Sequence, residues 1–292
     1  MNKTNISATM AGQVALGGKL SVNRLGFGAM RLTGEGVWGP PKERKAALAV
    51  LRRAVELDVN FIDTADSYGP SVSEELIAEA LFPYPSGLVV ATKGGWNRPG
   101  PNQWTHDASP SHLRKALEGS LKRLRLDRID LYQLHMPDPV ISFEASVETL
   151  AELRSEGKIR EIGLSNVTQE HIERARKIVP IVSVQNRYSF ADREWDYVVE
   201  YCQRNQIAFI PWFPLAAGKV AGDVLNRIAK AHDASPTQTA LAWLLRRSPI
   251  MLPIPGTSSL EHLEQNVAAA SLRLNEQEFE DLYEVSELVG SR

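Results

Sequence analysis

The sequence contains a single cysteine, Cys202, so the chain cannot form an internal disulfide, and a reducing compartment fits this composition. The surrounding segment "VVEYCQRN" has a helical pattern, which favours a buried structural thiol over a nucleophile. No hydrophobic run approaches the roughly 20 residues that a membrane helix needs. The first residues, "MNKTNISATMAGQ", also lack the apolar stretch of a signal peptide. We therefore expect a cytoplasmic protein that does not bind a membrane.

The two signs of charge nearly balance, because 33 lysines and arginines stand against 35 aspartates and glutamates, for a formal net charge of −2. This balance gives no indication of nucleic acid as a partner. A metal-dependent hydrolase is a weak alternative, since the sequence has no His-x-His pair and no clustered carboxylates at the expected strand ends. We see no linker or low-complexity segment, so we expect one domain over residues 1–292, acting as a monomer.

Short apolar runs alternate with stretches of helical apolar spacing along the chain. We expect strands near residues 24–29, 59–63, 87–92, 129–134, 159–164, 181–185, 207–212 and 251–254. This alternation predicts a (β/α)8 barrel. An open doubly wound sheet is the alternative, although "LGFGAM" lacks the third glycine of a dinucleotide-binding fingerprint. The segment "GQVALGGKLSVNRLG" predicts a β-hairpin that covers the barrel floor, and two extra helices are expected near 259–270 and 275–288.

Four residues of complementary chemistry lie at or just beyond the ends of three expected strands. Asp63 follows "VNFI", Lys93 follows "LVVAT" and His135 follows "IDLYQL", while Tyr68 lies five residues after Asp63. The carboxyl ends of barrel strands open at one mouth, where barrel enzymes keep their active sites. We therefore expect these four residues, called the tetrad below, to converge there.

The tetrad has the chemistry needed to reduce a carbonyl group. Free tyrosine has a pKa of about 10, so a buried Lys93 ammonium is needed to stabilise the phenolate of Tyr68. Asp63 would keep that lysine charged and oriented, and His135 would hold and polarise the carbonyl oxygen. No side chain delivers hydride, so a nicotinamide cofactor is implied. The residues alone leave a second interpretation open, namely a buried Asp–Lys pair with a core tyrosine and an unrelated histidine.

Several segments, in order, resemble those of the aldo-keto reductases, over roughly residues 15–290: "NFIDTADSYG", "ATKGG", "IDLYQLH", "IREIGLSN", "VSVQNRYS" and "LPIPGTSSLEHLEQN". The resemblance implies a (β/α)8 barrel, an NAD(P)H cofactor extended across its mouth, and reduction of aldehydes or ketones. It makes Tyr68 the general acid, Lys93 and Asp63 its activating pair, and His135 the orienting group.

The resemblance also implies the cofactor contacts. Ser165, Asn166 and Gln185 would hold the nicotinamide carboxamide, which needs both donors and acceptors; Asn166 could instead be a simple helix N-cap. Trp212 stands where the family commonly has a tyrosine stacked on the nicotinamide. Further contacts are expected beneath the cofactor, over its pyrophosphate and at its adenine, from Gly28, Ala29, Met30, Pro214, Leu215, Gly218, Lys219, Gln265 and Asn266. A solvated surface lysine is the alternative for Lys219.

The last loop, "IPGTSSLEHLEQN", bears on the choice between NADPH and NADH. Thr257, Ser258 and Ser259 open a helix whose free N–H groups suit a 2′-phosphate. Many family members have lysine at the position of Gly256 and arginine at that of His262, and this chain lacks both cations. An imidazole at 262 adds positive charge only when protonated. We expect NADPH to be preferred, less strongly than in those relatives, with NADH as the alternative.

Three insertions can form walls for a small or medium carbonyl substrate, and they carry Trp38, Trp96 with Trp104, and Met136. Arg31 could bind an anionic substrate or form a surface salt bridge. The chain ends soon after its last expected helix, so we expect an open, permissive pocket. A pyridoxal-like aldehyde, a sugar aldehyde and a keto-acid derivative all stay open as substrates. A cofactor-sensing regulatory subunit of the same fold is the alternative function, although the complete tetrad favours catalysis.

Overall fold

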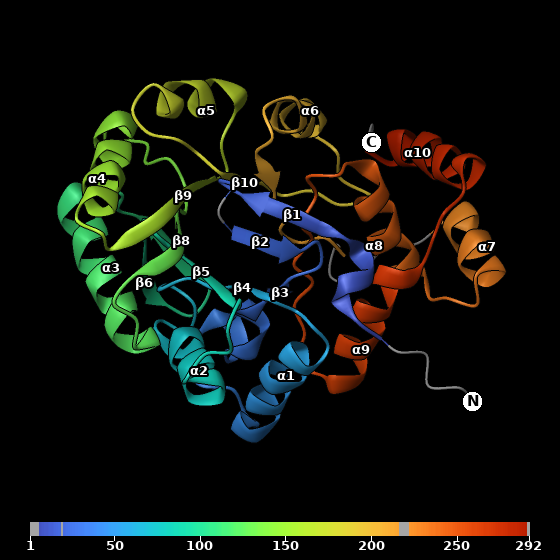
Figure 1. Cartoon of the computed structure of the whole chain (residues 1–292), viewed down its shortest axis with the longest axis horizontal. Helices are drawn as coiled ribbons and strands as arrows, with labels where there is room; N and C mark the ends of the chain where they lie inside the picture. The colour runs from blue at the N-terminus through green and yellow to red at the C-terminus, as the bar shows by residue number, and fades with distance from the viewer. Residues whose placement is uncertain (1–5, 19, 216–221, 291–292) are drawn as a thin grey trace.

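The computed structural model describes residues 6–18, 20–215 and 222–290. Its centre is a curled parallel sheet with the strand order β11-β10-β9-β8-β5-β4-β3, and helices surround it (Figure 1). The strands are β3 (Phe27–Gly28), β4 (Phe61–Asp63), β5 (Val89–Gly94), β8 (Ile129–Leu134), β9 (Ile159–Ser165), β10 (Ser183–Gln185) and β11 (Ala208–Phe209). Alternation of strand and helix along the chain therefore produces the predicted (β/α)8 barrel.

The eighth expected strand, near 251–254, is reduced to one bridge in the structure. Met251 pairs in parallel with Phe209, whose N–H donates to the Ile250 carbonyl at 2.9 Å. On the other side, the Gly26 N–H donates to the Pro253 carbonyl at 2.9 Å, which connects this segment to the start of the sheet. Proline has no N–H group to donate. This segment therefore closes the barrel without forming a regular ladder.

Ten α-helices lie in the described part of the chain, and most agree with the sequence pattern. Their bounds are α1 (Arg44–Glu56), α2 (Val72–Leu81), α3 (Pro110–Leu124), α4 (Phe143–Ser155), α5 (Gln169–Arg176), α6 (Asp196–Arg204), α7 (Asp223–Ala231), α8 (Pro236–Arg247), α9 (Leu260–Ala268) and α10 (Glu276–Gly290). Helix α7 was not expected from the sequence. Cys202 lies buried in α6, where burial raises the pKa of its thiol to about 12, as suits a structural residue.

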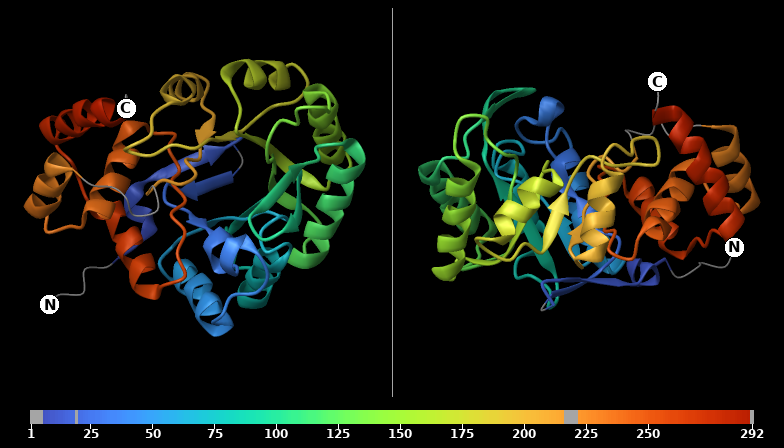
Figure 2. Two further views of the ribbon diagram at one scale, coloured as in Figure 1. Left: turned by 180° about the vertical axis from the view of Figure 1, so that it is seen from behind. Right: turned by 90° about the horizontal axis from the view of Figure 1, so that it is seen from above.

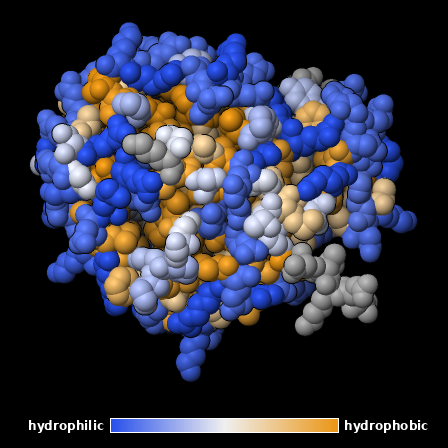
Figure 3. Space-filling model, in the orientation of Figure 1, coloured by the Kyte–Doolittle hydropathy of each residue, from blue (hydrophilic) through white to orange (hydrophobic). Residues whose placement is uncertain are grey.

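The predicted N-terminal hairpin is present as β1 (Gln13–Leu16) and β2 (Leu20–Asn23). Its buried side chains pack against Phe61 and Val89, the first residues of two barrel strands. The hairpin therefore covers the amino-terminal end of the barrel, and Figure 1 shows it lying across that face. In the space-filling view of the same face, hydrophilic residues predominate around the periphery, over the helices (Figure 3).

A second hairpin, which the sequence did not predict, follows β5 directly and consists of β6 (Trp96–Gly100) and β7 (Gln103–His106). Figure 2 shows it at the opposite end of the molecule from the N-terminal hairpin. The 3₁₀ turns are η1 (Ala8–Ala11), η2 (Ala29–Leu32), η3 (Glu35–Val37) and η5 (Ala269–Ser271). No helix in the described part of the chain is long and apolar enough to span a membrane.

Candidate active site

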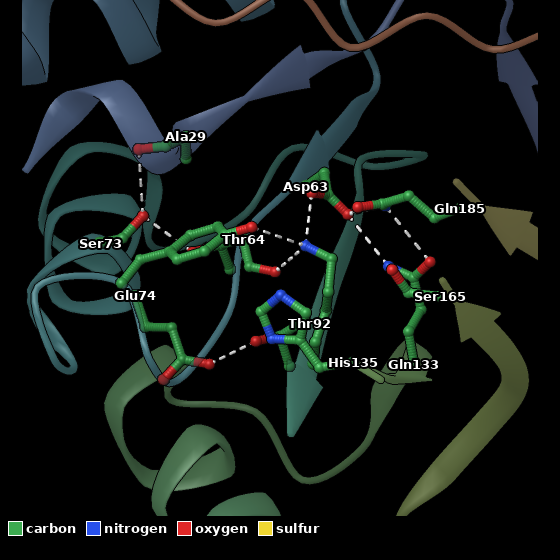
Figure 4. Close-up of polar contacts among 12 residues, drawn as sticks. Ala29, Asp63, Thr64, Ser73, Glu74, Thr92, Gln133, His135, Ser165 and Gln185 are labelled. Atoms are coloured by element: carbon green, nitrogen blue, oxygen red, sulfur yellow. Dashed lines mark hydrogen bonds and ion pairs between the residues drawn. The ribbon is translucent and has the colours of Figure 1, made fainter. Parts of the chain in front are cut away.

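The structure brings the four residues of the tetrad together at the carboxyl end of the barrel. Figure 4 labels two of them, Asp63 and His135, together with the polar residues around them. Asp63 ends β4, Lys93 lies in the neighbouring β5, and His135 follows β8, the next strand of the sheet. Tyr68 comes from the loop between β4 and α2. All four are buried, with exposed fractions of 2% for Asp63, 0% for Lys93, 7% for Tyr68 and 8% for His135.

The ammonium group of Lys93 donates three hydrogen bonds, two of them to other residues of the tetrad. Its Nζ donates to Asp63 Oδ1 at 2.6 Å, to the Thr64 carbonyl at 2.8 Å and to the Tyr68 hydroxyl at 3.3 Å. The second carboxylate oxygen of Asp63 accepts from Gln185 Nε2 at 2.8 Å and from Gln133 Nε2 at 3.0 Å. A buried ion pair is tolerated only when its remaining hydrogen-bonding groups are satisfied, and here they are.

Three shifted pKa values define the protonation states of the site. Burial alone would lower the pKa of Lys93, but the Asp63 carboxylate and the Tyr68 hydroxyl leave it raised. Burial raises the pKa of Tyr68 although Lys93 opposes it, and burial together with the charge of Lys93 lowers the pKa of His135 well below its ordinary value. At neutral pH the lysine is therefore charged, the phenol keeps its proton, and the imidazole is neutral.

The Tyr68 and His135 rings meet edge to face, with centroids 5.9 Å apart, beside a cavity of about 580 Å³. The cavity walls are mainly aromatic and apolar, and they include Trp96, Trp104, Met136, Trp212, Phe213, Ile254 and Pro255. Trp96 and Met136, which were predicted to contact the substrate, thus lie in the wall of this cavity, and their substrate role stays a prediction. Trp38, the third predicted substrate contact, is not among the described residues that line this cavity, and its backbone forms a bridge with Gly69.

The amide residues at the next strand ends also line the cavity, but part of their hydrogen-bonding capacity is used within the protein. Asn166 Oδ1 accepts from Trp212 Nε1 at 3.0 Å, and Gln185 Nε2 donates to Asp63. The Ser165 hydroxyl and the Gln185 carbonyl oxygen are left as a donor and an acceptor for a ligand. Asn166 is not the N-cap of α5, because Thr168 holds that position and accepts from the His171 N–H. Asn166 instead adopts a left-handed conformation with φ 58°.

A second cavity, of about 850 Å³, adjoins the first. Four described residues line both cavities, namely Met30, Arg31, Leu215 and Gly256. The predicted adenosine contacts line the second cavity: Thr257, Ser258, His262, Gln265 and Asn266. Pro214 lines the first cavity, and Gly218 and Lys219 lie outside the described residues. The two cavities therefore provide an elongated site that runs from the tetrad to the start of α9.

Close backbone approach explains the glycines beneath this site. A Cβ atom at Gly256 would lie 2.5 Å from the Gly28 carbonyl oxygen, and one at Gly28 would lie 2.7 Å from the Ile254 carbonyl oxygen. Neither position can carry a side chain unless the backbone moves, which accounts for the missing lysine at 256. An elongated dinucleotide fits this arrangement, with the flat Trp212 ring at one end and the N-terminus of α9 at the other.

Two residues with direct roles in the geometry were missed in the sequence. Gln133 holds Asp63, and it lies within the apolar run "IDLYQL", where its polarity is the only signal. Arg98 lies on β6, and nothing in its sequence context distinguished it from a surface arginine.

Comparisons with known proteins agree with this geometry. The family model described as "Aldo/keto reductase family" matches residues 24–287. An uncharacterized oxidoreductase of Schizosaccharomyces pombe is 49% identical over 281 residues, covering 96% of this chain and 91% of the relative. Pyridoxine 4-dehydrogenase of Escherichia coli is 46% identical over 268 residues, covering 89% of this chain and 93% of the enzyme.

Solved structures show the same fold. A thermostable aldo-keto reductase in complex with the inhibitor epalrestat superposes with a TM-score of 0.83 at 30% identity, covering 94% of this chain and 99% of that one. An aldo-keto reductase from Klebsiella pneumoniae in complex with NADPH gives a TM-score of 0.80 at 29% identity, with 94% of each chain covered.

Proposed function

This chain belongs to the aldo/keto reductase family of oxidoreductases, and we propose that it reduces aldehydes or ketones to alcohols with NADPH, with Tyr68 as the general acid. The observation that carries the proposal is the contact of the Tyr68 hydroxyl with Lys93 Nζ, at 3.3 Å, beside an open cavity. A phenol that keeps its proton at neutral pH and lies against a buried ammonium can donate that proton to a substrate oxygen as the oxygen gains negative charge.

The reaction needs one hydride and one proton for each carbonyl group. NADPH, when bound, supplies the hydride to the carbonyl carbon. Tyr68 donates its hydroxyl proton to the carbonyl oxygen as that oxygen gains negative charge, and Lys93 stabilises the tyrosinate until it takes a proton from solvent. Neutral His135 donates an N–H hydrogen bond to the same oxygen and orients it. The products are the alcohol and NADP⁺.

The elongated site supports a dinucleotide as the reductant. Ser165 and Gln185 would hold the carboxamide, and Trp212 would stack on the nicotinamide ring. Arg31 lines both cavities and makes no ion pair with the described residues, so its guanidinium is free to neutralise a phosphate between them. The hydroxyl-rich start of α9 supports a 2′-phosphate, hence NADPH over NADH.

We further propose a heteroaromatic aldehyde of the pyridoxal type as the substrate. The cavity next to Tyr68 presents the rings of Trp96, Trp104 and Trp212, which suit a flat aromatic compound. The similarity to pyridoxine 4-dehydrogenase supports the same substrate class.

A panel of carbonyl compounds tests this function. Purified protein would be mixed with NADPH or NADH and with pyridoxal, 4-nitrobenzaldehyde, glyceraldehyde or a 2-keto acid, and the alcohols would be quantified by chromatography. We expect turnover of both aromatic aldehydes, with NADPH preferred. A protein that binds NADPH but reduces none of these compounds would contradict the proposal and favour a cofactor-sensing regulatory role.

A further inference from the structure

Arg98, on the β6–β7 hairpin, connects three separate segments around the active site. Its Nη1 donates to the Ser67 carbonyl at 2.8 Å and to the Val37 carbonyl at 2.9 Å. Its Nη2 donates to the Gly36 carbonyl at 2.9 Å, and its Nε donates to Gln103, in the partner strand of the hairpin, at 2.8 Å. One side chain thus joins the hairpin to the η3 turn, through Gly36 and Val37, and to the loop that carries Tyr68.

The position of the Ser67 contact makes this connection relevant to catalysis. The Ser67 carbonyl belongs to the peptide group that leads directly into Tyr68. The general acid is therefore tied on one side to Lys93 through its hydroxyl, and on the other to Arg98 through its backbone.

The same guanidinium also fixes the aromatic wall of the cavity. It stacks on the ring of Trp104, 3.7 Å from the ring centroid. Trp104 in turn lies edge-on to Tyr68 and to His135, with centroids 6.5 Å away in each case, and 5.8 Å from Trp96. Arginine suits this place because its planar group can stack on a ring and donate in several in-plane directions at once.

We propose that Arg98 is a positioning residue that fixes Trp104 and the Tyr68 loop relative to each other, so that the pocket is preformed for a flat aromatic aldehyde. The inference rests on the proposed function and deepens it. Arg98 touches neither substrate nor cofactor in this scheme, since the lining of the cavity contains Trp104 and Tyr68 but, among the described residues, not Arg98 itself.

The geometry predicts a specific loss of selectivity when Arg98 is replaced. In Arg98→Met the hairpin loses its four carbonyl contacts, and Trp104 loses the group stacked on it. The preference for benzaldehyde over propanal, measured as a ratio of kcat/KM values at saturating NADPH, should fall about three- to tenfold, the range that one well-placed aromatic contact is worth. The change should fall mainly on the KM for benzaldehyde.

Three further single variants and one double variant separate this role from general destabilisation. Arg98→Lys keeps the charge but cannot donate to all of these carbonyls in one plane, so it should lose most of the preference as well. Arg52→Met is the matched control, because Arg52 also donates to a backbone carbonyl, that of Ala80, but on α1. Trp104→Leu should lower the preference, and adding Arg98→Met to it should lower the preference no further, since both substitutions remove the same contact.

A binding measurement makes the test independent of turnover. Quenching of tryptophan fluorescence by 4-nitrobenzyl alcohol, in the presence of NADP⁺, should weaken in Arg98→Met and Arg98→Lys but not in Arg52→Met. An Arg98→Lys variant that matches the wild type, or additive losses in the double variant, would overturn the inference. A wild type that binds the alcohol but reduces no aldehyde would contradict the proposed function, while the binding arm would still decide the role of Arg98.

Discussion

At the scale of single residues, the site depends on buried polar groups whose partners come from the protein itself. The location of Asp63 and Lys93 was predictable, because each follows an apolar run and the carboxyl ends of barrel strands open at one mouth. Gln133 was not, because a single polar residue within a strand can face either the barrel interior or the surrounding helices. Its role became visible only when the register brought its amide to 3.0 Å from Asp63.

Replacing Lys93 tests the coupling between charge and stability. Lys93→Met removes the group that stabilises the tyrosinate and leaves Asp63 buried without its cation. We expect turnover to fall at least about 10²-fold, and the free energy of unfolding to fall by roughly 3–5 kcal/mol unless Asp63 becomes protonated. Lys158→Met is the control, because Lys158 pairs with Glu118 and Glu156 at the surface, where such pairs contribute little. Steady-state kinetics and thermal unfolding measure both variants. If Lys93→Met and Lys158→Met had equal effects on turnover and on stability, Lys93 would have neither of these roles.

Asp66 provides a pH-dependent test of stability. Burial, together with the nearby charge of Glu74, raises the pKa of Asp66 to about 8, and its Oδ1 is buried without a partner among the described residues. A carboxyl whose pKa is raised on folding stabilises the protein at low pH, and the benefit is lost as pH rises from about 4 to 8. Asp66→Asn should therefore melt higher than the wild type at pH 8, by roughly 2 °C or more, with no gain near pH 4.

Asp107 supplies the control of opposite sign. Burial would raise its pKa, but hydrogen bonds from Ser109 outweigh burial and lower it. Asp107→Asn should therefore lower the melting temperature at pH 8, and the loss should shrink as the pH falls below about 4. Parallel pH profiles for the two variants would show that the Asp66 carboxyl is not protonated in the folded protein.

At the scale of elements, the order of strands and helices could be predicted, but their lengths and the loop structures could not. The apolar run near 251–254 was expected as a strand. Pro253 and Pro255 have no backbone N–H to donate to a neighbouring strand, and only the bridge between Met251 and Phe209 forms among the described residues. The β6–β7 hairpin was hidden because its segment, "GGWNRPGPNQWTHD", is rich in glycine and proline, which is typical of a loop. The N-terminal hairpin was predictable from its alternation and its Gly-Gly turn.

That turn offers a paired test of how the hairpin packs. Gly17 and Gly18 both have positive φ, of 67° and 71°, so alanine costs backbone strain at either position. A Cβ atom at Gly17 would also lie 2.9 Å from Val182 Cγ1, whereas one at Gly18 would meet nothing within 4 Å. Gly17→Ala should be about 1–3 kcal/mol less stable than Gly18→Ala in denaturant unfolding. Equal stabilities of the two variants would mean that the turn at Gly17 does not pack closely against Val182.

At the scale of the whole molecule, the two ends of the barrel have different tasks. The N-terminal hairpin seals the amino-terminal end with apolar packing, and the carboxyl end carries the tetrad and both cavities. The extended shape of the combined site could be expected from the family resemblance. The lack of room for a lysine at position 256 could not be predicted from the sequence, since it depends on how closely the Gly28 carbonyl approaches Gly256.

This arrangement predicts how cofactor preference can be changed. A side chain at 256 would collide with backbone, so a cation is better added at position 262, which lines the second cavity. His262→Arg should strengthen NADPH binding by about 10- to 100-fold, because a charge-assisted contact to the 2′-phosphate contributes roughly 1.5–3 kcal/mol. NADH, which lacks that phosphate, is the internal control and should bind with unchanged affinity. Equal gains for both cofactors in fluorescence titrations would place the 2′-phosphate elsewhere.

One experiment follows the hydride by isotope and tests Tyr68 as the proton donor by substitution. NADPH deuterated at C4 of the nicotinamide would be incubated with 4-nitrobenzaldehyde and either wild-type protein or Tyr68→Phe, and the alcohol would be analysed by NMR. With the wild type we expect deuterium on the alcohol carbon. In Tyr68→Phe we expect the rate of deuterium transfer to fall about 10²-fold or more, while the affinity for NADPH stays within a few-fold of the wild type. Deuterium transfer by Tyr68→Phe at more than about a tenth of the wild-type rate would contradict Tyr68 as the general acid.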